Sequence, residues 1–177
     1  MPVFRRGIPG KGRGLTTDSP DAIRKVAELL KDQRLGFLTT TMPDGRLTSR
    51  PMALQEVEFD GDLWFFAEQD APWLTHIAAS PQVNVGAGSG GTWISLTGTA
   101  EITEDVAKKK ELWNKGVEAW LPQGPEDPSV VLVKVHGDTA EYWDTPGGRL
   151  ATAFSFVKAK VTGQRIEAGE NEKVDLS

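Results

Sequence analysis

The sequence is a succession of short extended runs separated by tight turn signals, and this pattern limits the fold more than any other feature. The runs are rich in β-branched and aromatic residues, and clusters such as Pro43-Asp44-Gly45 and Asp60-Gly61 stand between them. We expect six or seven strands, within residues 35–41, 47–59, 63–67, from 83 onwards, 92–102, 130–135 and 139–143. Because strands and helices do not alternate regularly, the chain is expected to be mainly β, with an antiparallel sheet closed or split into a barrel.

Two strands carry a specific expectation about their place in the sheet. Residues 63–67 are apolar at every position, which is typical of a strand buried on both faces in the middle of a sheet. Residues 130–135 and 139–143 are expected to pair with each other around a turn at His136-Gly137-Asp138.

Short helices are expected between the strands. Ser19 and Pro20 suit the start of a helix that ends near Gln33, and a second short helix is expected at about residues 72–79. Residues 104–120 form a charged stretch with apolar residues on one side, as in an amphipathic helix. Residues 150–161 can form a last helix that ends at Gly163.

The length and composition correspond to one domain with a flexible segment on each side. A chain of 177 residues, 38% of them hydrophobic, can bury one core. Residues 1–17 contain four basic residues, four glycines and no acid, and we expect a flexible basic arm there. The barrel domain is expected over residues 18–163, followed by an acidic flexible tail over residues 164–177.

Charge and composition argue against several classes of protein. A net charge of −5 disfavours nucleic-acid binding, and the absence of cysteine excludes disulfides and thiolate metal sites and fits a reducing compartment. The sequence has no apolar run of about 18 residues and no signal peptide, so we expect a cytoplasmic protein without a membrane partner.

The motifs that look catalytic at first sight have simpler explanations. Residues 86–91 match the dinucleotide pattern G-x-G-x-x-G, but a strand-like segment follows them instead of a helix, so we interpret them as a glycine-rich hairpin turn. His76 and His136 are the only histidines, and neither belongs to a metal-ligand cluster, so no metal site is expected. No serine lies in a G-x-S-x-G nucleophile elbow.

Several strings, in their order and spacing, carry a family resemblance. They are Leu38-Thr39-Thr40-Thr41, Thr48-Ser49-Arg50-Pro51-Met52, Leu63-Trp64-Phe65-Phe66, Pro81-Gln82-Val83-Asn84-Val85, Ser95-Leu96-Thr97-Gly98-Thr99-Ala100-Glu101, Leu112-Trp113 and Glu141-Tyr142-Trp143-Asp144-Thr145-Pro146-Gly147-Gly148-Arg149. Together they resemble the FMN-binding split-barrel family related to the pyridoxamine phosphate oxidases, and the last string resembles its general-stress-protein branch.

This resemblance implies a split barrel that forms a side-by-side homodimer, with FMN held in clefts at the interface. It implies that Arg50 reaches the phosphate or ribityl chain of FMN; the alternative is a surface arginine paired with Glu56 or Glu58. Trp143 and Arg149 resemble a pair contributed by the partner subunit, although Trp143 also suits a core role. The full set of cofactor-binding candidates is Arg50, Pro51, Met52, Gln55, Phe66, Ala67, Trp73, Trp93, Ser95, Trp143 and Arg149.

The sequence departs from the family at the phosphate pocket. A threonine, a serine and a lysine are usual there, whereas this chain has Ala67, Ala71 and Trp73, with Asp70 nearby. Each change removes a donor or a positive charge that would bind the phosphate. Trp73 either fills the vacated volume or stacks on a different aromatic ligand.

Three functional hypotheses follow from these observations. The first is a flavin-binding protein with an oxidoreductase or stress-related role, in which FMN does the chemistry and no catalytic residue is assigned. The second is a binding or sensing protein whose cleft has lost tight FMN affinity and accepts another planar ligand. The third is an interaction module that uses its basic arm and acidic tail. Turnover of pyridoxamine phosphate itself is not expected.

Overall fold

A computed structural model describes residues 19–55, 57–144 and 170–176 of the chain. Its helices are α1 (Ser19–Leu30), α2 (Leu74–Ala79), α3 (Val106–Leu112) and α4 (Lys115–Trp120). Its strands are β1 (Leu35–Thr41), β2 (Leu47–Ala53), β3 (Asp62–Glu68), β4 (Gln82–Ser89), β5 (Thr92–Thr103), β6 (Val130–Asp144) and β7 (Glu170–Asp175). The predicted arm over residues 1–17, the predicted helix over 150–161 and the candidate Arg149 lie outside the described residues.

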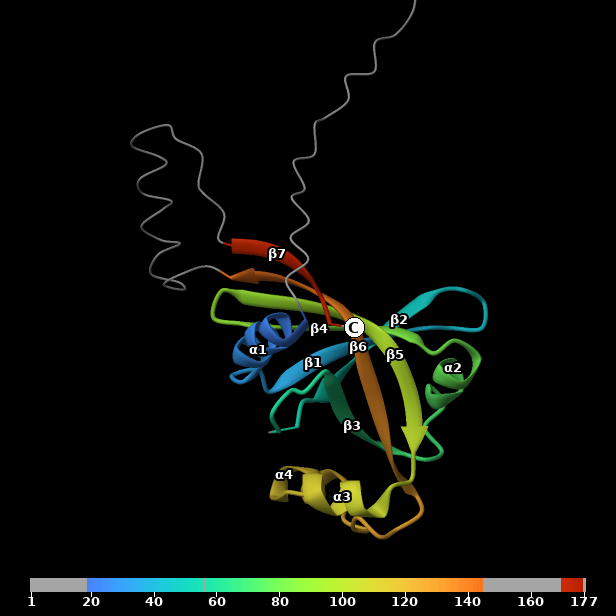
Figure 1. Cartoon of the computed structure of the whole chain (residues 1–177). Coiled ribbons are helices and arrows are strands. Elements are labelled where there is room, and N and C mark those ends of the chain that lie inside the picture. Colours follow the sequence, from blue (N-terminus) through green and yellow to red (C-terminus); the bar gives the residue numbers. More distant parts are fainter. Residues whose placement is uncertain (1–18, 56, 145–169, 177) are drawn as a thin grey trace, which may run out of the picture.

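The strands form one curved antiparallel sheet, as Figure 1 shows. The strand order is β2-β1-β4-β5-β6-β3, and β7 also pairs with β6. Strands β2 and β3 follow each other in the sequence but stand at opposite ends of this order, and the sheet is split between them. The predicted fold class, a mainly β split barrel with short helices, is therefore confirmed.

The core lies on the concave face of the sheet. Alternate residues of β1, β3, β4, β5 and β6 point inward, and the buried set includes Leu38, Phe65, Val85, Leu96 and Val133. Val26 and Leu30 of α1 belong to the same cluster.

Within the described ranges, no helix has the length and apolar character that crossing a membrane requires.

Strand β6 differs from the prediction, because residues 130–144 form one strand of 15 residues instead of two paired strands. The expected turn residue Gly137 lies inside the sheet, opposite Gly98 of β5. A β-bulge separates Thr97 from Gly98, and a Cβ atom on Gly98 would lie 2.1 Å from the His136 carbonyl oxygen. Glycines on both strands allow this close backbone approach, so a composition that is typical of a turn occurs within a continuous strand.

Strand β3 also differs from the prediction, because it lies at one end of the strand order and, among the described strands, pairs only with β6. Its burial alternates: Leu63, Phe65 and Ala67 face the core, and Trp64 and Phe66 face outward. Phe66 contacts Trp113, which lies between α3 and α4 in the sequence, edge-on at a centroid distance of 5.3 Å. This outward face is apolar because the helices cover it, not because the strand is central.

The segments around β6 give two further corrections. The predicted flexible tail from residue 164 contains strand β7, which pairs with residues 139–144, and Val174 and Leu176 are buried.

The predicted helix over 104–120 is two helices, because the side chain of Asn114 accepts hydrogen bonds from the backbone of Gly116 and Val117 and starts α4. Trp120, the last residue of this stretch, is 85% exposed although it is apolar.

The glycine-rich hairpin is confirmed. Strand β4 pairs along its whole length with residues 92–99 of β5, and Gly90 and Gly91 form the turn between them with φ values of 65° and 110°. Such positive angles favour glycine in a two-residue hairpin turn.

Candidate functional site

Arg50 is the charged residue at the centre of the candidate site. Residues of β2 alternate, so that Thr48, Arg50 and Met52 are half-buried and the residues between them are exposed. The Nη2 atom of Arg50 donates a hydrogen bond to Thr40 Oγ1 at 3.1 Å, and its guanidinium lies 4.7 Å from the ring centre of Trp73. A hydroxyl and an aromatic face therefore hold this side chain.

The second terminal nitrogen of Arg50, Nη1, is buried and has no hydrogen-bond partner among the residues that the structure describes. Burial lowers the pKa of this guanidinium from its ordinary value. The alternative pairing with Glu58 is absent from the ion pairs among the described residues, and Glu56 lies outside them. Buried arginine donors are usually paired, so the free N–H indicates a place for an anionic or carbonyl acceptor.

Thr40 and His76 extend this cluster and were not among the predicted site residues. Thr40 is 1% exposed, and its Oγ1 atom lies 3.1 Å from His76 Nδ1. Thr40 belongs to β1 and His76 to α2, so two elements meet behind Arg50. In the sequence, Thr40 stands in a row of three threonines, and only the alternation of the strand distinguishes its inward position.

The three altered pocket positions supply no charged group to the cluster. Ala67 belongs to the buried core, and Ala71 and Trp73 pack against that core. Because the Trp73 ring contacts both the core and the Arg50 guanidinium, it fills volume in this chain. These contacts correspond to the first of the two alternatives for Trp73, in which it fills the vacated volume.

A second group of candidates lies on the opposite, outer face of the sheet. Pro51 of β2 pairs with Phe37 of β1, Phe37 pairs with Gly86 of β4, and Gly86 pairs with Ser95 of β5. Phe37 is 58% exposed, and Ser95 Oγ accepts a hydrogen bond from Asn84 at 2.8 Å. The row is thus an apolar surface with one polar group that is already held in place.

Trp93 and Trp143 continue the outer face beyond this row. They pair directly across β5 and β6, and they are 58% and 39% exposed. The Trp93 ring covers the backbone of Gly88, where an added Cβ atom would lie 2.2 Å from Trp93 Cε3. A core role for Trp143 is therefore wrong, since both indole rings belong to the surface of the single chain.

The remaining candidates lie apart from both groups. Gln55 follows β2, where its Oε1 accepts a hydrogen bond from Asn114 at 3.3 Å and its Nε2 donates to the Ala53 carbonyl. Phe66 faces Trp113 on the outward side of β3. One chain thus brings Arg50, Met52 and Trp73 together, but the outer-face candidates lie across the thickness of the sheet.

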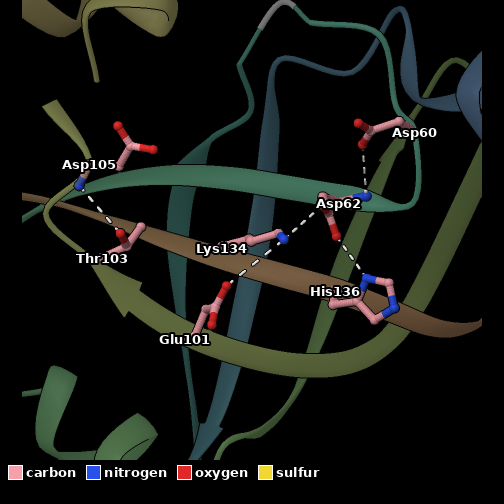
Figure 2. Close-up of polar contacts among 7 residues, drawn as sticks. All are labelled: Asp60, Asp62, Glu101, Thr103, Asp105, Lys134 and His136. Carbon is pink, nitrogen blue, oxygen red and sulfur yellow. Dashed lines mark hydrogen bonds and ion pairs between the residues drawn. The ribbon is translucent and has the colours of Figure 1, made fainter. Parts of the chain in front are cut away.

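A different polar cluster lies at the start of β3, as Figure 2 shows. The Asp62 carboxylate accepts a hydrogen bond from His136 Nδ1 at 2.8 Å and contacts Lys134 Nζ at 3.0 Å; Lys134 also lies 3.8 Å from Glu101. The hydrogen bond to Asp62 raises the pKa of Lys134. The cluster connects β3, β5 and β6, and the described residues contain no group of side chains suited to a metal ion.

Comparison with solved structures gives several relatives of similar fold. A protein described as general stress protein 26 from Jannaschia sp. CCS1 is 26% identical, with a TM-score of 0.72, over 88% of this chain and 99% of the other. General Stress Protein 26 from Bacillus anthracis str. Sterne is 31% identical, with a TM-score of 0.61, over 68% and 92%. The general stress FMN/FAD binding protein from Xanthomonas citri is 26% identical, with a TM-score of 0.62, over 73% and 92%.

Sequence comparison agrees with the structural one. Protein bli-3 from Neurospora crassa is 28% identical over 170 residues, which cover 88% of this chain and 81% of that protein. The family model described as "Pyridoxamine 5'-phosphate oxidase like" matches residues 21–167, which form the larger part of the sequence. The chain therefore belongs to the pyridoxamine 5'-phosphate oxidase like family, as the sequence resemblance indicated.

Proposed function

We propose that this protein binds FMN in a cleft between two copies of the chain and has a stress-related, oxidoreductase-type role. The family membership and the likeness to a general stress FMN/FAD binding protein support a flavin ligand. The zero cysteine content supports a reducing, cytoplasmic location.

The observation that carries the proposal is the buried, unpartnered Nη1 atom of Arg50. A phosphate oxygen is an acceptor of suitable charge for that N–H, and Thr40 and Trp73 hold the guanidinium in position. The residues present therefore fit an anionic group, with Arg50 as its main cation. Ala67 and Ala71 add no donor and Trp73 adds no positive charge, so we expect weaker phosphate binding than in a pocket with a threonine, a serine and a lysine.

The position of the other candidates supports an assembly of two copies. Arg50 points inward from β2, whereas Pro51, Ser95, Trp93 and Trp143 lie on the outer face, so one chain alone does not surround a planar ligand. Exposed apolar residues such as Phe37 and Trp93 give this outer face the character of a protein interface. A second copy packed there would bring its tryptophans toward the edge of the first copy's site.

A bound FMN would supply hydride or electron transfer at its ring system. The chain's own part would be to hold the phosphate through Arg50, to exclude water with apolar residues such as Met52, and to orient the ligand. We assign no proton donor or acceptor for the reaction, and we do not propose pyridoxamine phosphate oxidase activity.

Trp73 provides the specific reason to keep a second candidate function. Since its ring occupies the side of Arg50 where the family usually has polar groups, the site also suits a planar ligand with a smaller anionic group. This candidate is a binding or sensing protein without flavin turnover.

The decisive experiment is a parallel titration of the purified protein with FMN and with riboflavin, followed by flavin fluorescence. Tight, stoichiometric FMN binding with clearly weaker riboflavin binding supports the phosphate role of Arg50. Equal affinity for both flavins points to a ring-binding site without phosphate recognition, and no binding of either favours the second candidate. Sedimentation equilibrium on the same samples tests the dimer.

A further inference from the structure

A continuous polar chain runs from Arg50 through Thr40 to His76. Arg50 Nη2 donates to Thr40 Oγ1 at 3.1 Å, and the same oxygen lies 3.1 Å from His76 Nδ1. Thr40 is almost completely buried, while Arg50 and His76 are half-buried. The hydroxyl therefore has two fixed nitrogen neighbours, and its hydrogen-bonding pattern depends on the state of the imidazole.

The hydrogen-bond donors among Arg50, Thr40 and His76 can be counted. A guanidinium only donates, so the Thr40 oxygen accepts from Arg50. If the imidazole is neutral with a lone pair on Nδ1, the Thr40 hydroxyl donates its single hydrogen to His76. If the imidazole is protonated, both of its nitrogens donate: Nδ1–H donates to the Thr40 oxygen, and the hydroxyl hydrogen of Thr40 turns toward another acceptor.

We propose that Thr40 and His76 are a proton-linked positioning pair, through which uptake of one proton at His76 strengthens anion binding at Arg50. Protonation adds a second positive charge two hydrogen bonds from the guanidinium and directs the Thr40 O–H away from His76. The inference rests on the proposed function, in which the anion is the phosphate of a flavin, but the pair would act on any small oxyanion.

The charged surroundings of His76 are compatible with this behaviour. Residues 74–79 of α2 contain no other charged group, and β1 contains none. Asp44, in the turn between β1 and β2, interacts electrostatically with His76. The pKa of Asp44 is lowered mainly by hydrogen bonds from Arg46 and only slightly by His76. On β5, which packs against α2, the one charged residue is Glu101, and it contacts Lys134.

Two more carboxylates precede α2: Glu68 at the end of β3 and Asp70 in the loop that follows, both exposed. Arg50 is thus the cation nearest to the imidazole in this hydrogen-bonded chain. Two cations so close repel each other unless an anion lies beside them, so the proton and the anion are expected to bind cooperatively. Anion affinity should then rise as the pH falls through the range in which histidine changes its charge.

Inorganic sulfate is the probe that tests this pair, since its own charge stays constant between about pH 6 and pH 8, the range in which histidine titrates. Titration calorimetry in two buffers of different ionisation enthalpy measures both the affinity and the protons taken up. For the wild-type protein, we expect sulfate affinity to rise toward low pH, by at most about tenfold per pH unit, together with proton uptake on binding.

Three variants separate the roles of the side chains: one at His76 and a matched pair at Thr40. His76→Asn keeps a hydrogen-bonding group near the position of Nδ1 but cannot titrate, so the pH slope and the proton uptake should disappear. Thr40→Ser keeps the hydroxyl and should retain both, whereas Thr40→Val removes it and should lose both. Circular dichroism of each variant reports whether the fold is intact, and the His76→Asn result decides the question if Thr40→Val does not fold.

Two results would overturn the inference. One is a pH dependence of sulfate affinity in His76→Asn that equals that of the wild type, and the other is a wild-type protein that binds no sulfate across this pH range. FMN titrations at the same pH values distinguish this failure from failure of the proposed function. If FMN binds but its pH dependence does not change in His76→Asn, the flavin proposal stands and the pair has no such role. If sulfate binding is proton-linked but FMN does not bind, the pair acts on a different oxyanion.

Discussion

The Nζ atom of Lys109 donates a hydrogen bond to the main-chain carbonyl of Val130 at 2.8 Å, in a position that is almost entirely buried. The same ammonium contacts the carbonyl of Asp127 at 3.2 Å. A lysine of α3 therefore holds the segment that leads into β6. Lys109→Met keeps most of the side-chain volume but leaves both carbonyls without this donor, and should lower the free energy of unfolding by about 1–3 kcal/mol. Denaturant unfolding measures this; a Met variant as stable as wild type contradicts it.

Arg50→Met should weaken FMN binding by about 10- to 100-fold, because one or two charge-assisted hydrogen bonds to the phosphate are lost. Riboflavin has no phosphate, so its affinity should change far less and serves as the control. Fluorescence titration of both flavins checks this expectation. A parallel loss for FMN and riboflavin would mean that Arg50 supports the fold of the site and does not bind phosphate.

Phe37→Ser should dissociate the proposed dimer, since Phe37 stands in the middle of the apolar row on the outer face. Loss of a central aromatic contact in each copy should raise the dissociation constant by at least about 30-fold. Sedimentation equilibrium gives the measurement. Trp120→Ser is the matched control, because Trp120 is more exposed but belongs to α4, and its loss should leave self-association unchanged.

Gly88→Ala should displace the Trp93 ring, because the added methyl group would overlap it. Trp93 is mostly exposed and can rotate away, so we expect unfolding stability to change by less than about 1 kcal/mol while the outer face loses its shape. Near-ultraviolet circular dichroism and sedimentation should both change. Gly86→Ala adds the same group with no atom within 4 Å in the single chain. An equal spectral change in both variants would exclude displacement of Trp93 as the cause.

The Asp127 carboxylate should make stability depend on acidity. Its pKa is lowered first by the hydrogen bond from the Ser129 hydroxyl and then by the Ser129 backbone N–H. A carboxyl with a lower pKa in the folded state stabilises the protein above the unfolded-state pKa, and this contribution is lost as the pH falls through the folded-state value. Asp127→Asn should therefore show a smaller loss of thermal stability in acid. A variant with the wild-type acid profile would contradict this origin.

The sequence predicts those parts of the fold that local chemistry determines. The Gly90-Gly91 hairpin and the bend at Asp60-Gly61 follow from backbone conformations that glycine favours, and Gly61, Gly90 and Gly91 all have positive φ. The continuity of β6 was not predictable, since Gly137 occurs as readily in a turn as in a strand, and only its pairing with Gly98 distinguishes the two. Contacts between segments far apart in the sequence therefore decide whether Gly137 lies in a turn or in a strand.

The candidate site shows the same division. Arg50 was identified from its string of neighbours, and its buried donor is consistent with that interpretation. Thr40 and His76 were missed, because they are 36 positions apart and only the packing of α2 on β1 brings them together. Strand alternation predicts on which face of its strand each of Pro51 and Ser95 lies. Only the order of the strands in the sheet shows that the two residues lie in one row.

Strand β6 pairs on one side with β3 along its first half and with β7 along its second half. Residues 145–169 separate β6 from β7 in the sequence, so during synthesis the second half of β6 leaves the ribosome well before its partner. Until β7 arrives, one edge of residues 139–144 has unpaired backbone groups, which are a template for pairing with another chain. The time at which residues 170–175 become available is thus expected to control whether a nascent chain folds or aggregates.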